Sequence, residues 1–191
     1  MKKQSTILVI ALVIIGIVTF YLLKNNNHAQ TQPASISSES NNETISGEID
    51  ESNKIKDFSL PDITGKEVSV MNEISKNRLT IIDFWASWCR PCMQEMPNIK
   101  ALHSQYKTLG IIGISLDEDK EQWQNTINEQ DLNWVQLSDL QGWNSKAARL
   151  FEVSSIPYTI VVAQDGTIIA AGLRGESLNA FIKSRMTSQT E

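Results

Sequence analysis

Hydrophobic and polar residues are distributed unevenly along the chain and divide it into three parts. Residues 7–23 form an almost wholly apolar run, close to the ~20 residues that a membrane-spanning helix needs. Residues 25–54 are dominated by Asn, Ser, Gln, Thr and Glu, and a segment with so little apolar surface is expected to be a flexible linker. Residues 55–191 combine apolar and polar positions in regular patterns and are predicted to fold as one domain.

Charges around the apolar run predict its orientation in a membrane. Lys2 and Lys3 precede the run and Lys24 alone follows it closely, so the positive-inside rule leaves the N-terminus in the cytoplasm. A cleaved secretory signal is the competing interpretation, but no A-x-A-like cleavage site follows the run. We therefore favour a single-pass anchor over residues 1–24 in a plasma or inner membrane. Both interpretations place the folded domain outside the cytoplasm.

Apolar periodicity in the folded part predicts strands that alternate with helices. Apolar or alternating runs predict strands over 57–60, 67–70, 79–85, 110–115, 158–163 and 167–171. Apolar residues at helical spacing predict helices over 91–106, 118–129, 144–151 and 177–186. The last two strands flank Asp165-Gly166, a strong hairpin signal. This order predicts an α/β fold in which helices flank a central mixed sheet, with the first two strands as an N-terminal hairpin extension.

Composition and charge narrow the possible functions. The net charge of −5, from 22 acidic and 17 basic residues, argues against nucleic-acid binding, which usually requires a basic surface. Two cysteines, Cys89 and Cys92, and two histidines are too few for a disulfide-stapled scaffold or a metal cluster. The two sulfur atoms are therefore the first candidates for chemistry.

Cys89 and Cys92 belong to the segment Cys89-Arg90-Pro91-Cys92, between a predicted buried strand and a predicted helix. Cysteines three residues apart lie on one helix face, within the Cα separation of ~4.4–6.8 Å that a disulfide requires. The helix N-terminus, with Arg90 beside it, favours the thiolate form of Cys89. Cys89 is therefore predicted to be the attacking nucleophile, and Cys92 the resolving thiol of a redox-active disulfide.

Three other interpretations of this motif are weaker. Half of a zinc site would need a second cysteine or histidine pair, which the sequence lacks. An inert structural disulfide would add little stability, because the closed loop is so short. Chance is unfavourable because both cysteines of the chain fall in the motif.

The segment Phe84-Trp85-Ala86-Ser87-Trp88-Cys89-Arg90-Pro91-Cys92 resembles the active-site segment of thioredoxins. Residues 55–186 as a whole resemble the membrane-anchored ResA/TlpA-like thiol-disulfide oxidoreductases, from the opening 57–62 through Ile156-Pro157 to the Asp165-Gly166 hairpin. The resemblance implies a thioredoxin fold and an oxidoreductase activity. No cofactor and no metal are expected.

The resemblance also assigns residues to substrate binding. Pro157 falls at the cis-proline of the family, which faces the active-site disulfide, and Ile156 would offer its backbone to an extended substrate segment. An ordinary trans proline at a strand start is the alternative. Trp88 is expected to shape the docking surface, and Trp85 is a weaker candidate because aromatics near a buried strand are more often core. Pro97 matches a helix-kinking proline of the family.

Two acidic residues are candidates for proton transfer. Asp83 lies in a predicted buried strand, where burial should raise its pKa. It matches the buried acid of thioredoxins, which exchanges protons with the resolving cysteine; the alternative is a carboxylate that points to solvent or caps a turn. Glu95 lies on the same helix face as Cys92, and the resemblance associates such an acid with pKa control and substrate recognition. The alternative for Glu95 is a solvated helix charge.

Other conspicuous residues are assigned no chemical role. His103 is expected at the surface of a helix. Trp123, Trp134 and Trp143 fall in the segment between the two halves of the predicted core and are expected to serve packing.

These residues together predict an extracytoplasmic enzyme that reduces protein disulfides. Cys89 would attack the substrate disulfide and Cys92 would release the reduced product, with a proton passing to Asp83 or Glu95. The resemblance implies a transmembrane electron donor of the CcdA/DsbD type. It also implies apocytochrome c, before haem attachment, as an example of the substrate.

Two other function classes stay open. A peroxiredoxin-like thiol peroxidase shares the fold, but it would require Thr or Ser three residues before the nucleophile, where the chain has Ala86. A metal-carrying chaperone would be a binding module, but such relatives usually carry a C-x-x-x-C motif and a distant histidine.

Overall fold

The computed structural model describes residues 53–187. The apolar run at 7–23 and nearly all of the expected linker lie outside the described residues, so the anchor and its orientation stay predictions. Within residues 53–187, no helix has both the length and the apolar character needed to cross a bilayer.

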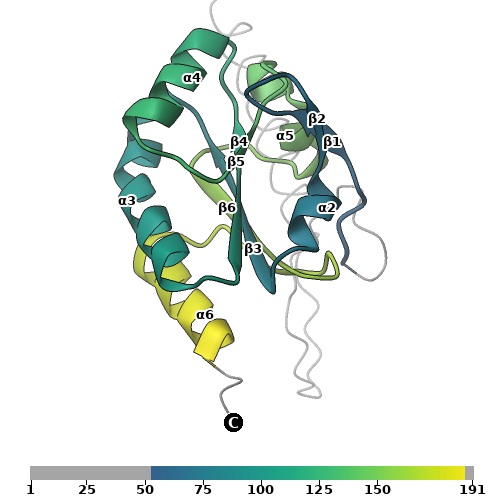
Figure 1. Cartoon of the computed structure of the whole chain (residues 1–191), viewed down its shortest axis with the longest axis vertical. Coiled ribbons are helices and arrows are strands. Elements are labelled where there is room, and N and C mark those ends of the chain that lie inside the picture. Colours follow the sequence, from purple (N-terminus) through teal and green to yellow (C-terminus); the bar gives the residue numbers. More distant parts are fainter. Residues whose placement is uncertain (1–52, 188–191) are drawn as a thin grey trace, which may run out of the picture. The chain divides into compact units, whose positions relative to one another are not determined.

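A five-stranded sheet forms the centre of the domain (Figure 1). Its strands are β3 (Leu79–Trp85), β4 (Leu109–Ser115), β5 (Val135–Leu137), β6 (Tyr158–Ala163) and β7 (Ile168–Ala171). Their order is β5-β4-β3-β6-β7; β3, β4 and β5 run parallel, and β6 is antiparallel to both β3 and β7. The sheet is therefore mixed, as predicted. A separate antiparallel hairpin consists of β1 (Ser59–Pro61) and β2 (Glu67–Ser69).

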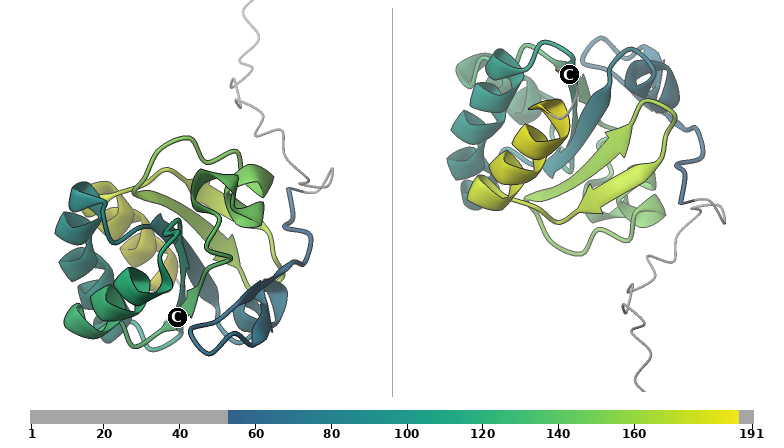
Figure 2. Two further views of the ribbon diagram at one scale, coloured as in Figure 1. Left: turned by 90° about the horizontal axis from the view of Figure 1, so that it is seen from above. Right: turned by 90° about the horizontal axis from the view of Figure 1, so that it is seen from below.

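Helices cover both faces of the central sheet (Figures 1 and 2). One face carries α3 (Arg90–Gln105), α4 (Lys120–Glu129) and α6 (Gly175–Thr187). The other face carries α2 (Val70–Ile74) and α5 (Lys146–Leu150), the latter preceded by the 3-10 turn η1 (Gly142–Asn144). This arrangement is a thioredoxin fold, which confirms the predicted fold class for the described residues.

Two apolar clusters hold these layers together. β3 and β4 are buried along their whole length, because helices cover them on both faces. One cluster joins the sheet to α3 and α6 through residues such as Ile81, Ile99 and Leu178. The larger cluster includes both cysteines and Trp85. The end of β3 and the start of α3 are therefore packed into the core.

Some element boundaries differ from the predicted ones. The predicted strand 67–70 ends at Ser69, because the Ser69 hydroxyl accepts a hydrogen bond from the N–H of Asn72 at 3.1 Å and caps α2. The predicted helix 144–151 shortens to α5, since the chain first forms η1. Strand β5 has no counterpart in the prediction, because its three residues are too few to show a period.

The last residues of the expected linker contact the folded domain. The N–H of Ile168 donates to the carbonyl of Asn53 at 3.0 Å, and Lys54 forms a β-bridge with Thr167. Lys54 also forms a salt bridge with Asp165 at 2.8 Å. Asn53 and Lys54 thus extend the β6–β7 hairpin.

His103 and Trp143 lie differently from their expected places. His103 is half-buried, and its ring packs edge-on against Trp134 with a centroid distance of 5.6 Å. Its expected surface position is therefore only partly right, because Trp134 covers one side. Trp123 is buried as predicted, but Trp143 is 46% exposed, so the packing role expected for Trp143 is wrong.

Candidate active site

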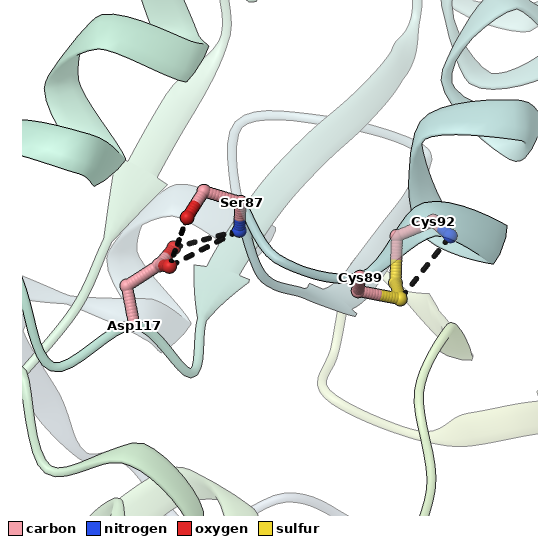
Figure 3. The surroundings of a disulfide bond; sticks show 4 residues. All are labelled: Ser87, Cys89, Cys92 and Asp117. Atoms are coloured by element: carbon pink, nitrogen blue, oxygen red, sulfur yellow. Dashed lines mark hydrogen bonds between the residues drawn. A yellow bond between two sulfur atoms is a disulfide. The ribbon is translucent and has the colours of Figure 1, made fainter.

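Cys89 and Cys92 form a disulfide at the start of α3 (Figure 3). The sulfur atoms are 2.01 Å apart and the Cα atoms 5.2 Å apart, within the range expected from the spacing. Cys89 is the N-cap residue of α3, and Pro91 occupies the first turn, where its missing N–H leaves no carbonyl unpaired. Local sequence therefore places the disulfide where strand β3 gives way to helix α3.

Two features of this junction favour negative charge on the Cys89 sulfur. The N–H of Cys92 donates a hydrogen bond to Cys89 Sγ at 3.2 Å. The N-terminus of the 16-residue helix α3 adds partial positive charge at the same place. In the reduced protein both would stabilise a thiolate on Cys89. Cys92 is the more deeply buried cysteine, at 1% exposure against 5% for Cys89, which suits it to the resolving step.

Asp117, which was not among the predicted site residues, holds the loop between β3 and Cys89. Its carboxylate accepts hydrogen bonds from the Ser87 N–H at 3.0 and 3.1 Å, from the Ser87 hydroxyl at 2.5 Å and from the Ser115 hydroxyl at 2.6 Å. Figure 3 shows the hydrogen bonds between Ser87 and Asp117 at one end of the loop and the disulfide at the other. The sequence does carry a signal for Asp117, because this residue closely follows the predicted buried strand β4. β4 runs parallel to β3, so the carboxyl ends of the two strands lie side by side.

Asp83 is buried in the middle part of β3, at 3% exposure. Its Oδ1 atom has no hydrogen-bond partner among the residues that the structure describes. Burial, and secondly the negative charge of Glu95, raises the pKa of Asp83 from 3.8 to about 7. The direction is the one expected from the apolar surroundings, and the alternative of a solvent-facing carboxylate does not hold.

Glu95 is half-buried on α3 and is not a freely solvated helix charge. Its Oε1 accepts hydrogen bonds from Asn98 Nδ2 at 2.7 Å and from the backbone N–H of Gly175 at 2.8 Å. Gly175 is the first residue of α6, so Glu95 joins two helices. Glu95 thus links α3 to α6, and its negative charge contributes to the raised pKa of Asp83.

The peptide bond between Ile156 and Pro157 is cis, so the trans alternative is wrong. Tyr158, the next residue, pairs with Phe84 in the register of β6 and β3. β3 ends at Trp85, and the chain continues from there to Cys89. This register therefore places the cis bond, which directly precedes β6, beside the carboxyl end of β3. Pro157 is buried and Ile156 half-buried.

The two tryptophans of the motif occupy opposite environments. Trp85 is fully buried, and its Nε1 donates to Gln136 Oε1 at 3.1 Å, so Trp85 belongs to the core and not to a docking surface. Trp88 is 54% exposed beside Cys89. The Trp143 ring lies near it, with a centroid distance of 6.3 Å. Trp143 is thus a further candidate for the docking surface.

Comparisons with known proteins agree with this geometry. Residues 77–168 match a family model described as thioredoxin-like. The chain is 30% identical over 124 residues to the thioredoxin-like protein YneN of Bacillus subtilis, a match that covers 63% of this chain and 69% of YneN. It is 27% identical over 114 residues to the thiol-disulfide oxidoreductase ResA of Bacillus cereus, covering 59% of this chain and 63% of that protein. These matches span about two thirds of the length of the relatives.

A solved structure extends the agreement to three dimensions. The thiol-disulfide oxidoreductase from Bacteroides fragilis superposes with a TM-score of 0.65 at 33% identity, covering 69% of this chain and 98% of that structure. The fold, the disulfide and the similar proteins all indicate the same family. The chain belongs to the ResA-like thiol-disulfide oxidoreductases of the thioredoxin family.

Proposed function

We propose that this protein is an extracytoplasmic thiol-disulfide oxidoreductase that reduces disulfides of protein substrates, held at a plasma or inner membrane by residues 7–23. The observation that carries the redox part is the disulfide between the N-cap Cys89 and Cys92, one turn into α3. Membership of the ResA-like family supports it. The location rests on the apolar run and on the lysines around it.

The reaction is an exchange of disulfides in two steps. In the reduced protein, the Cys89 thiolate attacks one sulfur of the substrate disulfide, and the other substrate sulfur leaves as a thiolate. The Cys92 thiolate then attacks the Cys89 sulfur, which forms the Cys89–Cys92 disulfide and releases the second substrate sulfur. Two electrons have then passed from the protein to the substrate.

Asp83 suits the second step as a proton acceptor for Cys92. A general base works best when its pKa lies near the working pH, and the pKa of Asp83 is about 7. The backbone of Ile156, next to the cis-proline Pro157, would pair with the substrate segment around its cysteine. This pairing depends little on substrate side chains.

The cycle needs a substrate and a source of electrons. Apocytochrome c before haem attachment is the substrate that the resemblance to ResA-like proteins supports. A transmembrane dithiol donor of the CcdA/DsbD type would return two electrons to the Cys89–Cys92 disulfide. In the proposed topology, the domain would meet both the substrate and the donor's dithiol on the extracytoplasmic side of the membrane.

Reduction of a disulfide-bonded test peptide by the pre-reduced full chain tests the redox part. Cys89→Ser should abolish turnover, because the attacking sulfur is lost. Cys92→Ser should accumulate a mixed disulfide between Cys89 and the peptide, visible as an added mass. Undiminished turnover with Cys89→Ser contradicts the proposal. Equilibration with glutathione gives the direction, since a reductant must lie on the reducing side of that couple.

Protease treatment of intact protoplasts or spheroplasts tests the location. An extracytoplasmic domain should be digested from outside while a cytoplasmic marker protein stays intact. Protection of the domain until the membrane is lysed contradicts the proposed topology.

A further inference from the structure

Two exposed tryptophans lie together beside the disulfide. Among residues 53–187, Trp88 and Trp143 are the large hydrophobic side chains with high exposure, at 54% and 46%. They come from different parts of the chain, the loop before α3 and the turn η1, yet their ring centroids are 6.3 Å apart. Paired exposed indoles next to a reactive sulfur indicate a surface that a partner covers.

These indoles line a groove with a volume of about 360 Å³. The remaining lining residues are Leu116, Asp117, Glu118, Asp119, Gln122 and Gly142. The volume is at the low end of the ~300–1,000 Å³ typical of ligand sites, which suits one long side chain. Because Trp88 directly precedes Cys89, an occupant of the groove lies next to the nucleophile.

The polar wall of the groove is negatively charged. It carries three carboxylates, from Asp117, Glu118 and Asp119, and no basic side chain. Asp117 is occupied by the hydrogen bonds from the Ser87 loop. Asp119 caps α4 and accepts two backbone N–H groups there. Both carboxylates are therefore already engaged by hydrogen-bond donors of the protein.

Glu118 is the carboxylate that remains available to a ligand. It is exposed and makes no hydrogen bond or salt bridge with any residue between 53 and 187. Its side chain lies against the backbone of Gly142, where an added Cβ would come 2.5 Å from Glu118 Oε1. Gly142 has φ +55°, a conformation that favours glycine. The absence of a side chain at Gly142 therefore leaves room for this carboxylate next to Trp143.

We propose that this groove binds a lysine or arginine side chain of the substrate polypeptide, at a position flanking the cysteine that Cys89 attacks. The cationic group would lie on the indole faces of Trp88 and Trp143 and pair with the carboxylate of Glu118. An acidic side chain would meet three like charges, and a purely apolar one would leave Glu118 without a partner. The inference rests on the proposed function, because the groove matters through its place beside Cys89.

Three disulfide-bonded peptides that differ only at the residue flanking the cysteine test this groove. The flanking residue is Lys, Glu or Leu, and kcat/KM is measured with the pre-reduced full chain. We expect the Lys peptide to exceed the Glu peptide by about fivefold to tenfold at low salt, from one cation–π contact and one exposed ion pair. Added salt should shrink this ratio.

Two variants of the chain assign the preference to the groove. Glu118→Gln should bring the ratio of the Lys to the Glu peptide close to one. Glu129→Gln makes the same change of charge at the far end of α4, on another exposed glutamate, and should keep the wild-type ratio. Trp143→Ala should lower kcat/KM for the Lys peptide by about threefold.

Several outcomes overturn the inference. Equal rates for the Lys and Glu peptides remove the charge preference, and a preference for the Leu peptide makes the occupant apolar. An equal loss of preference in Glu118→Gln and Glu129→Gln makes overall charge the cause.

Peptide binding can be measured separately from turnover, so failure of the proposed function can be told apart from failure of the cation site. A lysine peptide without cysteine should shift the indole N–H resonances of Trp88 and Trp143, whereas the matching glutamate peptide should not. If no peptide is reduced but these resonances shift, the proposed function fails and the cation site stands. If the disulfide peptides are reduced but no resonance shifts, the cation site fails alone.

Discussion

Glu95, one turn beyond Cys92 on α3, accepts a hydrogen bond at 2.8 Å from the backbone N–H of Gly175, the first residue of α6. The same oxygen accepts a hydrogen bond from Asn98 Nδ2 at 2.7 Å. After burial, the charge of Glu95 is also the second cause of the raised pKa of Asp83. One side chain thus connects the active-site helix, the C-terminal helix and the buried acid.

Glu95→Ala should lower the free energy of unfolding by about 1–2 kcal/mol, because the N–H of Gly175 at the start of α6 loses a charged acceptor. Glu95→Gln keeps an acceptor oxygen without the charge and should lose less than half as much. Urea denaturation of the three proteins at pH 7 measures both effects. Equal losses in the two variants, or no loss with Ala, would show that the contact with Gly175 does not stabilise α6.

Stability should fall as the pH rises from about 4 to about 7, because of Asp83. In the unfolded chain this carboxyl ionises near pH 3.8, whereas in the folded chain it keeps its proton up to about pH 7. In that window the unfolded state binds fewer protons, so each step up in pH favours unfolding, and the effect levels off above pH 7. The whole change amounts to about 4 kcal/mol, at ~1.4 kcal/mol for each pH unit between the two pKa values.

Asp83→Asn should remove this slope, since an amide does not titrate. The variant should therefore be more stable than the wild type at pH 8 and close to it at pH 4, in urea denaturation at both values. A slope that persists in the variant assigns the pH dependence to another group. The variant should also reduce disulfide peptides more slowly at pH 7, because Asp83 is the proton acceptor that we propose for Cys92.

Local patterns in the sequence were sufficient for most of the fold and for the disulfide. The buried strand 79–85, the helix that follows it and the Cys89-Arg90-Pro91-Cys92 spacing are all encoded within a few residues of one another. Such signals survive without knowledge of the tertiary structure, because periodicity and helix capping are local. The cis bond before Pro157 was predicted instead from the family resemblance.

The contacts between distant residues could not be predicted in this way. The bond from Gly175 to Glu95 spans 80 positions, and the Ser87–Asp117 network spans 30. Trp143 looked like one more core aromatic, since its exposure depends on where η1 lies relative to α3. Periodicity identifies the elements, but only their packing decides which side chains meet at the active site.

Asp117→Asn should destabilise the loop that carries Cys89. The carboxylate accepts hydrogen bonds from the Ser87 N–H and from the hydroxyls of Ser87 and Ser115. An asparagine amide would turn its NH2 group, itself a donor, toward one of these donors. We expect a loss of about 2–3 kcal/mol in the free energy of unfolding, since Asp117 is 1% exposed and its hydrogen bonds involve a charge. Ser87→Ala removes a single hydroxyl donor and should cost about 1 kcal/mol. A smaller loss in Asp117→Asn than in Ser87→Ala would contradict this account.

Gly113 and Gln136 should show strong coupling, because a side chain at position 113 would occupy the place of the Gln136 amide. A Cβ on Gly113 would meet Gln136 Oε1, the acceptor of the bond from Trp85 Nε1. Gly113→Ala should therefore displace Gln136, leave the buried indole N–H of Trp85 unpaired and cost about 1–3 kcal/mol. Gln136→Ala alone should cost a similar amount, because it removes the same acceptor.

The double variant Gly113→Ala with Gln136→Ala should lose less free energy of unfolding than the two single variants added together. The steric conflict disappears, and the hydrogen bond of the Trp85 indole N–H is lost once instead of being counted twice. The expected difference is about 1–2 kcal/mol, well above the ~0.3–0.5 kcal/mol within which independent sites add. Urea denaturation of the four proteins gives the cycle. Near-UV circular dichroism, to which the buried tryptophans Trp85 and Trp123 contribute, reports whether the core stays ordered in each of them. Additive losses would mean that Gly113 and Gln136 act separately, and that Trp85 is held by packing rather than by its hydrogen bond.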